Sequence, residues 1–229
     1  MTPDAAAWDA LRLSLWVAVW ATVLAIPLAL WVAWLLARRE FWGKSLLNAA
    51  VHLPLVLPPV VTGYLLLMAF GRTAPLGRAL DAIGLQLAFH WSGAVLAAMI
   101  MGFPLMVRAM RLAIEAVDPK LEDAAASLGA SRASVFGRVT LPLILPGILA
   151  GTVMGFAKAM GEFGATITFV ANIPGQTQTL PSAIWSALQI PGGEGQAVIM
   201  VVMASTVAIA AVLLSELLAR RVAARIAGA

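Results

Sequence analysis

Two opposite charges four residues apart, Lys158 and Glu162, are the side chains best placed for chemistry, because they interrupt an otherwise apolar stretch. This spacing sets both on one face of a helix, where they offset each other's charge. An ionisable group inside a membrane is costly unless it is paired or wetted. The pair therefore suits either of two roles: it lines a polar path through a membrane, or it holds a helix interface as a structural contact.

Catalytic chemistry has little support elsewhere in the sequence. The chain contains no cysteine and two histidines, His52 and His90, which excludes thiolate sites and is too few for a self-contained metal centre. No Ser/His/Asp grouping of a hydrolase is found. The nearest approach to a phosphate-binding loop is Gly43-Lys44-Ser45, but Arg38 stands where its first glycine belongs. We expect a non-catalytic chain with no metal or cofactor of its own.

The composition indicates that the segments carrying these charges lie in a membrane. Of 229 residues, 62% are hydrophobic and 11% are charged, and the mean hydropathy is +0.94. A soluble domain is about one quarter charged, so this chain cannot cover a water-facing surface. Soluble enzymes, disulfide-bonded secreted domains and disordered proteins are excluded together, and an all-α integral membrane protein remains.

Nearly uncharged stretches of about 20 residues mark candidate membrane-crossing helices. A single transmembrane domain, residues 1–229, is predicted, with spans at about 15–37, 45–71, 91–110, 139–173 and 195–218. The section 163–173 is expected to end a long helix and 180–190 to be half-inserted, which makes five to six transmembrane helices. Prolines at Pro54, Pro58 and Pro59 predict a kinked or broken second span.

Lysines and arginines collect on one side of these spans. They follow the first span, fill the segment between the third and fourth, and follow the last, whereas the other side has only Arg12, Arg72, Arg78 and Lys158. Basic residues favour the cytoplasmic side of short loops, so we expect the amino terminus outside and the carboxyl terminus in the cytoplasm. The pI of about 10.3 requires no nucleic-acid partner, because these groups anchor the chain at the edge of the membrane, against anionic lipid.

The segment 112–138 is the one sizeable hydrophilic connection, and it is predicted to be cytoplasmic. Asp118 and Pro119 suit the start of a helix, with the carboxylate as cap and the proline in the first turn. Gly129 suits the end of that helix, and Ser131 suits the cap of a second short helix that runs through Gly137. A helix, a turn and a helix are therefore expected at the membrane edge.

This segment carries a resemblance to a known family. Asp123-Ala124-Ala125, three residues, Gly129, nine residues and Val139-Thr-Leu141-Pro142 resemble the cytoplasmic EAA loop of ABC importer permeases, in which a short helix docks into a groove of the ATPase subunit. Asp123 and Val139 stand where the family usually has glutamate and often has isoleucine. The resemblance implies the type I ABC importer permease architecture and an ATPase-coupling set of residues: Glu122, Asp123, Ala124, Ala125, Gly129, Leu141 and Pro142.

A second resemblance runs from Met160 to Glu194. Gly161–Gly175, Gln176–Trp185 and Pro191-Gly-Gly-Glu194 are similar to stretches of molybdate ABC importer permeases, with tungstate and sulfate permeases as the alternatives. The resemblance implies a bacterial inner-membrane permease that pairs with a second copy of itself. It further implies two cytoplasmic ATPase subunits that bind ATP and magnesium, and a periplasmic or lipid-anchored oxyanion-binding protein.

Polar groups within the spans are the candidates for the path of an oxyanion through such a permease. Glu162 is not expected to ligate the anion, because a carboxylate repels a dianion, whereas hydroxyl and amide groups donate without holding it tightly. The predicted path or gate residues are Thr62, Tyr64, Lys158, Glu162, Thr166, Thr168 and Asn172. Each polar group alone also suits helix packing.

A gradient-driven secondary anion transporter, with Lys158 and Glu162 as an ion relay, is the alternative from another functional class. Such transporters often contain an internal inverted repeat. Five spans without such a repeat argue against this alternative.

Overall fold

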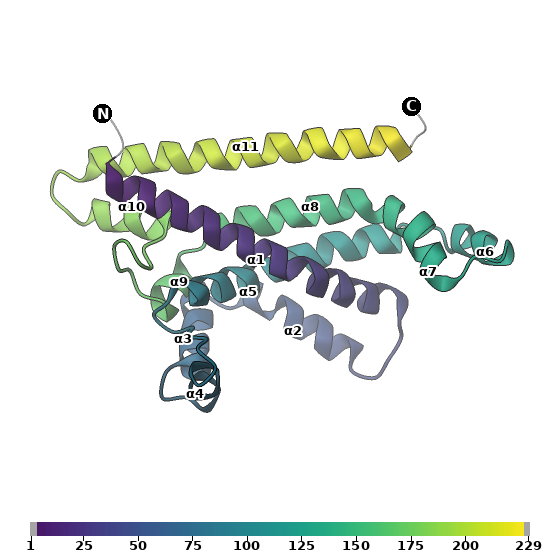
Figure 1. Ribbon diagram of the computed structural model, residues 1–229, viewed down its shortest axis with the longest axis horizontal. Coiled ribbons are helices and arrows are strands. Elements are labelled where there is room, and N and C mark those ends of the chain that lie inside the picture. The colour runs from purple at the N-terminus through teal and green to yellow at the C-terminus, as the bar shows by residue number, and fades with distance from the viewer. Residues whose placement is uncertain (1–3, 227–229) are drawn as a thin grey trace.

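The computed structural model describes residues 4–226, and this part of the chain is built from helices and loops (Figure 1). Four helical stretches are long and apolar enough to cross a membrane. They are α1 (Ala5–Arg38), α5 (Trp91–Glu115), α8 (Leu141–Met160) together with the short helices directly before it, and α11 (Glu194–Ile226). The all-α membrane fold expected from the composition is confirmed for the described residues.

A fifth candidate membrane span is formed by two helices with a break between them. Together α2 (Lys44–Val56) and α3 (Pro59–Phe70) are long and apolar enough to span, but the pair is bent by 115°. Leu57 and Pro58 each precede a proline, and both are extended, with ψ at 140° and 135°. A proline ring disfavours the helical conformation of the residue before it, so two successive prolines interrupt the helix. The predicted break of the second span is confirmed.

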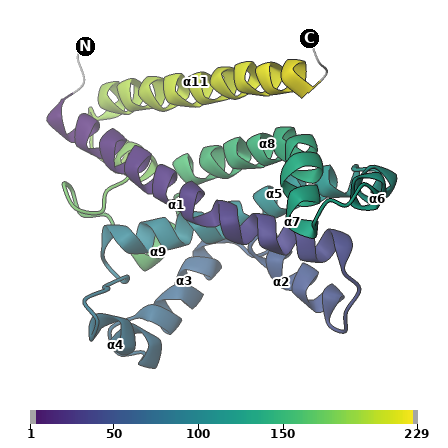
Figure 2. The ribbon, with the colours of Figure 1, turned by 45° about the vertical axis from the view of Figure 1, so that its right-hand side comes forward.

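The core is a seam of small side chains where α1 and α8 pack against α5 (Figures 1 and 2). Ala18, Ala21 and Ala25 lie at helical spacing on α1, and each is at most 1% exposed. Between α5 and α8, a Cβ atom built on Gly102 would lie 3.1 Å from the carbonyl oxygen of Gly155. Small residues let helix backbones approach closely, which is how many membrane helices associate.

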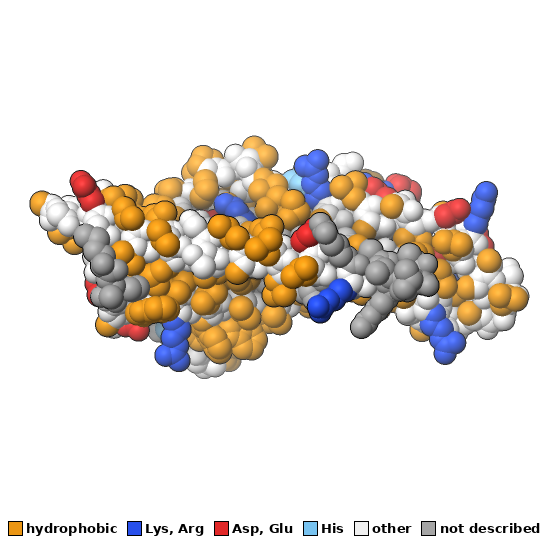
Figure 3. Space-filling view, turned by 90° about the horizontal axis from the view of Figure 1, so that it is seen from above, with side chains coloured by type: hydrophobic (Ala, Val, Ile, Leu, Met, Phe, Trp, Pro, Cys, Tyr) orange, Lys and Arg blue, Asp and Glu red, His pale blue; other side chains and the backbone are white. Residues whose placement is uncertain are grey.

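The remaining helices surround this seam. α11 packs against α8 and α10 (Leu180–Leu188), and Figure 3 shows many hydrophobic side chains on the described part of this face. Val198 and Ile209 of α11 are 62% and 60% exposed, which suits lipid surroundings. α4 (Pro75–Asp81) follows α3, whereas α6 (Pro119–Ser127) stands out from the end of the bundle where α5 ends (Figure 1).

The fourth span differs from its prediction at both ends. α8 ends at Met160, and α9 (Gly164–Phe169) begins after three non-helical residues, so one helix does not continue to residue 173. At the other end, α7 (Arg132–Val135) and the π-helical turn η1 (Phe136–Thr140) run directly into α8, so Gly137 does not end a separate helix. The wide π turn lies just before Pro142, whose ring conflicts with the carbonyl of a regular preceding turn.

Candidate functional site

The α6–η1 element, residues Asp118–Thr140, protrudes from one end of the helix bundle (Figure 2). The Asp118 carboxylate accepts a hydrogen bond from the Lys120 amide at 3.0 Å, and Pro119 takes the first position of α6. Proline suits that position because its missing amide would have no partner within the helix. The helix start predicted at Asp118 is confirmed.

Gly129 ends α6 in the left-handed conformation, with φ at +86°. The Gly129 amide donates to the Ala126 carbonyl at 2.9 Å, and the Ala130 amide donates to the Ala125 carbonyl at 3.2 Å. These two hydrogen bonds form the glycine-terminated helix end known as the Schellman motif. The helix stop predicted at Gly129 is confirmed, and the positive φ explains why glycine suits it.

Glu122 ties α6 to two other helices of the same chain. Its carboxylate accepts a hydrogen bond from the Thr140 hydroxyl at 2.6 Å and lies 3.3 Å from the Arg38 guanidinium. Thr140 is buried immediately before α8, and Arg38 is the last residue of α1. A displacement of α6 therefore either pulls on α1 and α8 or breaks these contacts.

The opposite face of α6 is free of the chain. Leu121 and Leu128, seven residues apart, are 50% and 90% exposed, and Ala124, on the same face, is exposed as well. Ala125 is half-buried. Asp123 is exposed, and its carboxylate forms neither an ion pair nor a hydrogen bond within residues 4–226. α6 thus presents an apolar stripe that its own chain does not cover.

Leu141 and Pro142 differ from the rest of the predicted coupling set. Both are partly buried in the first turn of α8. Leu141 packs against the apolar cluster that contains Val107 and Ile144. These two residues therefore join the α6–η1 element to the core and do not extend its exposed stripe.

A second polar site lies inside the bundle, where α8 gives way to α9. Lys158 Nζ lies 3.3 Å from one carboxylate oxygen of Glu162, and the other oxygen accepts a hydrogen bond from the Ala165 amide at 2.9 Å. The Glu162 side chain is 2% exposed and that of Lys158 is 32% exposed. Ala159 lines the same small void as Ala21, which is at the middle of α1. The ion pair is therefore near mid-depth of the bundle.

The break between α2 and α3 meets the start of α9. A Cβ atom built on Gly164 would lie 2.7 Å from the Cβ atom of Pro59, and one built on Gly63 would overlap the Ala165 carbonyl group. Thr62 is 6% exposed, and its hydroxyl has no hydrogen-bond partner within the described chain. Two interrupted crossings therefore touch at their interruptions, with an unpaired hydroxyl beside the contact.

The other predicted path residues lie in varied surroundings. Thr166 is 3% exposed in α9, and the Thr168 hydroxyl donates back to a carbonyl of the same helix at 3.0 Å. Asn172 donates to the Ser186 hydroxyl of α10 at 2.7 Å. Tyr64 is 55% exposed. Tyr64 and Asn172 are thus less buried than Thr166 at the junction of the two breaks.

Arg38, Thr140 and Pro59 contact the two sites although the sequence does not mark them as site residues. In the sequence, Arg38 stands out only as the residue at the first-glycine position of an incomplete phosphate-binding loop, and Thr140 only as part of the Val139–Pro142 motif. Pro59 enters only as a cause of the helix break. No cluster of three or more His, Asp or Glu side chains suited to a metal ion occurs within residues 4–226.

Comparison with known proteins gives these sites a family context. The family described as "Binding-protein-dependent transport system inner membrane component" matches residues 25–224. The chain is 55% identical over 214 residues to the molybdenum transport system permease protein ModB of Escherichia coli (strain K12), which covers 93% of both chains. It is 38% identical over 173 residues to the sulfate transport system permease protein CysW of Synechococcus elongatus, which covers 76% of this chain and 60% of that one.

A solved structure shares the fold. It is a bacterial ABC transporter involved in the import of the acidic polysaccharide alginate, with a TM-score of 0.74, 19% identity, and coverage of 95% of this chain and 80% of that one. At this identity the likeness concerns the fold, and the expected importer permease architecture is confirmed. By the extent of the family match and of the molybdenum relative, the chain belongs to the inner membrane components of binding-protein-dependent transport systems.

Proposed function

We propose that this chain is the permease subunit of an ATP-driven importer of molybdate. The observation that carries the proposal is the 55% identity to the molybdenum permease of Escherichia coli over 93% of both chains. The sulfate permease is more distant, at 38% identity over a smaller share of each chain. Tungstate matches molybdate in charge and shape, so it competes strongly for uptake, whereas sulfate competes weakly.

The permease acts in an assembly. It pairs with a second copy of itself, and two cytoplasmic ATPase subunits bind ATP and magnesium and supply the energy. A periplasmic or lipid-anchored protein binds the oxyanion and delivers it. The amino terminus lies outside and the carboxyl terminus in the cytoplasm, in keeping with the side on which lysines and arginines gather. The chain itself supplies the path and no catalytic group.

The ATPase subunit docks on the α6–η1 element. The stripe of Leu121, Ala124 and Leu128 suits a groove on a partner, because a short helix binds there through apolar residues of one face. Glu122 faces inward and transmits the movement of the docked helix to Thr140. This arrangement divides α6 into a face that receives the motion and a face that passes it on.

α8 links the docking site to the path. From Thr140 to Lys158 the chain is helical, a distance of about 27 Å along the axis. ATP binding draws the two α6–η1 elements together, and the path between the permease copies changes from inward-open to outward-open. ATP hydrolysis then resets it, so transport proceeds by alternating access.

The oxyanion passes the junction of the two helix breaks and meets Lys158 there. Lys158 is the only lysine or arginine between residues 139 and 214, and its side chain is more accessible than that of Glu162. Glu162 keeps a second partner, the Ala165 amide, when Lys158 turns to the anion. The hydroxyl groups of Thr62 and Thr166 give the path further donors that bind the anion weakly.

Uptake of labelled molybdate into vesicles that contain the permease, its ATPase and the binding protein tests the function. We expect accumulation that requires ATP and that tungstate suppresses more than sulfate does. The combined variant Gly129→Pro and Ala125→Arg should abolish uptake, because proline cannot adopt a φ of +86° and arginine obstructs the docking surface. Lys120→Gln, an exposed change on the same helix, is the control. Survival of ATP-driven uptake in the combined variant would contradict the docking assignment.

A gradient-driven anion transporter is the second candidate, and the intramembrane pair Lys158–Glu162 is the observation that favours it. It requires the purified chain to concentrate the anion alone. The same vesicles without ATPase and nucleotide, under an imposed ion gradient, distinguish the two candidates. Uptake under these conditions would replace the importer proposal.

A further inference from the structure

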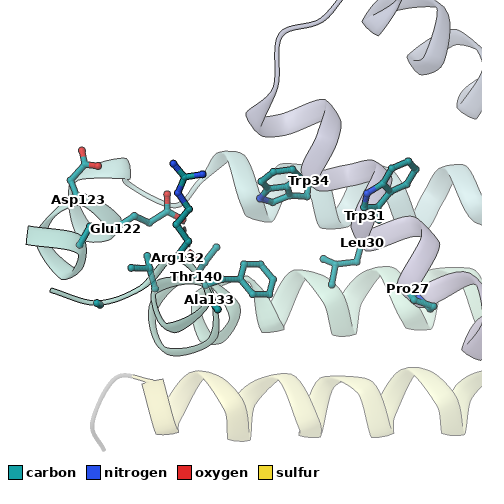
Figure 4. A pocket seen from close by; sticks show the side chains of 13 residues that line it. Pro27, Leu30, Trp31, Trp34, Glu122, Asp123, Arg132, Ala133 and Thr140 are labelled. Carbon is teal, nitrogen blue, oxygen red and sulfur yellow. Dashed lines mark hydrogen bonds between the residues drawn. The ribbon is translucent and has the colours of Figure 1, made fainter.

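A cavity of about 790 Å³ lies between α1 and the α6–η1 element. One wall is apolar and comes from α1, with Pro27, Leu30, Trp31 and Trp34. The facing wall comes from the α6–η1 element, chiefly through small and apolar side chains such as Ala133. Figure 4 shows that the lining is sorted by polarity, because Asp123, Glu122 and Arg132 lie at the end remote from Pro27.

The change in polarity runs along α1, and therefore across the membrane. Arg39 lies over the Trp34 ring, with its guanidinium carbon 5.2 Å from the ring centroid. A tryptophan beside a basic residue at a helix end is typical of the interface between hydrocarbon and water. Pro27 lies seven residues deeper, which is about 10 Å along the helix. The cavity thus has its apolar end at acyl-chain depth and its charged end at headgroup depth.

Among the side chains that line the cavity, the charges sum to zero once the pair of Glu122 with Arg38 is set aside; Arg39 lies over Trp34 and is not part of the lining. Glu122 is already paired with Arg38. Asp123 and Arg132 are both exposed, and neither has an ion-pair partner within residues 4–226. One free carboxylate and one free guanidinium therefore remain, on α6 and at the start of α7.

We propose that this cavity binds a membrane phospholipid whose headgroup carries both a phosphate and a primary ammonium group, as phosphatidylethanolamine does. Arg132 binds the phosphate, for which the planar guanidinium is well suited, and Asp123 accepts hydrogen bonds from the ammonium. An acyl chain lies along Trp31, Leu30 and Pro27. A purely anionic headgroup fits less well, because it would set a negative charge against Asp123.

Such a lipid has a structural consequence. It fills the space between α1 and the α6–η1 element, two parts that Glu122 already joins through its contact with Arg38. The proposal rests on the cytoplasmic membrane-edge position of the α6–η1 element but not on the identity of the transported anion. The lipid composition of the inner leaflet would then affect how firmly the α6–η1 element, on which the ATPase docks, is held against α1.

Native mass spectrometry of the permease–ATPase complex, released from vesicles of phosphatidylethanolamine and phosphatidylglycerol in equal amounts, tests the proposal. We expect retained phosphatidylethanolamine, and a loss of about tenfold in Arg132→Gln and in Asp123→Asn, the size expected for one charge-assisted contact. Ala133→Phe fills the cavity without changing its charge and should also displace the lipid. Arg138→Gln, exposed in η1 and outside the cavity, is the control.

Several results would overturn the proposal. They are preferential retention of phosphatidylglycerol, an equal loss in Arg138→Gln, and retention by the isolated permease that disappears in the complex, which would assign the cavity to the ATPase. Melting temperatures of all variants separate lipid loss from misfolding. Because the measurement detects lipid and requires no transport, its failure leaves the proposed import of molybdate untouched.

Discussion

Glu122 and Asp123 are adjacent acids with opposite surroundings. Glu122 contacts Arg38 and Thr140, whereas Asp123 points away from them and is exposed. The resemblance of the sequence to the EAA loop implies the same role for both, as members of the ATPase-coupling set. Their difference depends on contacts between residues far apart in the chain, which local spacing does not contain.

Replacement of Glu122 by glutamine should loosen α6 without changing its shape. The amide still accepts from Thr140 but loses the ion pair with Arg38, which costs about 1 kcal/mol of folding stability for a partly exposed pair. We expect a lower melting temperature and less molybdate transported per ATP hydrolysed. Lys120→Gln, an exposed change on the same helix, is the control for stability, and an equal drop in its melting temperature would argue against this role of Glu122.

A double-mutant cycle at Lys158 and Glu162 tests whether this pair lines the anion path or is only a structural contact. Lys158→Gln should lower uptake about tenfold or more, the effect of losing one charge-assisted contact of roughly 1.5 kcal/mol with the anion. Glu162→Gln should preserve most uptake, because the side-chain oxygen of glutamine can still accept the hydrogen bond from the Ala165 backbone amide.

The double variant decides between the two roles. Lys158→Gln with Glu162→Gln removes the unpaired buried charge, so we expect melting temperature to recover while uptake stays low. Recovery of uptake in the double variant would mean that the pair is structural. Lys158→Arg, which keeps the charge, should retain most of the transport.

At the scale of elements, the two helix breaks differ in how far the sequence reveals them. Pro58 and Pro59 act on the residues directly before them, so the break between α2 and α3 is predictable from local sterics. The break between α8 and α9 has no proline. It depends on the Glu162 carboxylate, which caps α9, and on the fit of Gly164 against Pro59. The run of apolar residues predicts one continuous helix here, because the contacts that stabilise the break come from another membrane-crossing segment.

Gly164→Ala should push the two breaks apart. The added Cβ atom would lie 2.7 Å from the Cβ atom of Pro59, and neither belongs to a flexible side chain. Overpacking of this kind costs roughly 1–3 kcal/mol, so we expect a lower melting temperature and impaired uptake. Gly161→Ala is the matched control, since its Cβ atom would have the Ala157 carbonyl oxygen as nearest neighbour, at 3.7 Å. Similar losses in both variants would show that the effect is not specific to the junction.

At the scale of the whole molecule, composition is the most informative part of the sequence. Hydropathy predicts a membrane protein, and three of the uncharged stretches lie inside α1, α5 and α11. The helices extend beyond these stretches, and α1 begins at Ala5, well before the predicted start at residue 15. The starts and ends of α6 also follow from its capping residues. The packing of the crossings is beyond this reasoning, because small residues such as Gly102 and Gly155 reveal a close contact only once their partners are known.

The orientation of the molecule is testable because the chain has no cysteine. Single cysteines at Gln176 and Lys120, both exposed, should react with a membrane-impermeant maleimide from opposite sides. We expect Gln176→Cys to be labelled in intact cells, and Lys120→Cys only after the membrane is opened. Ala18→Cys, at a position that is 0% exposed, should remain unlabelled in both cases. The reverse pattern would invert the proposed topology.

The seam of alanines and glycines between α1, α5 and α8 has a consequence for motion. The α1 and α8 faces of this seam have few long side chains, so these helices can shift along α5 with little repacking beyond that of flexible methionines such as Met106. We expect the main resistance to movement of α8 to come from the polar contacts at its two ends, around Thr140 and Glu162, and not from its middle. The rate of turnover would then be set by how quickly the polar contacts of Thr140 and Glu162 break and reform.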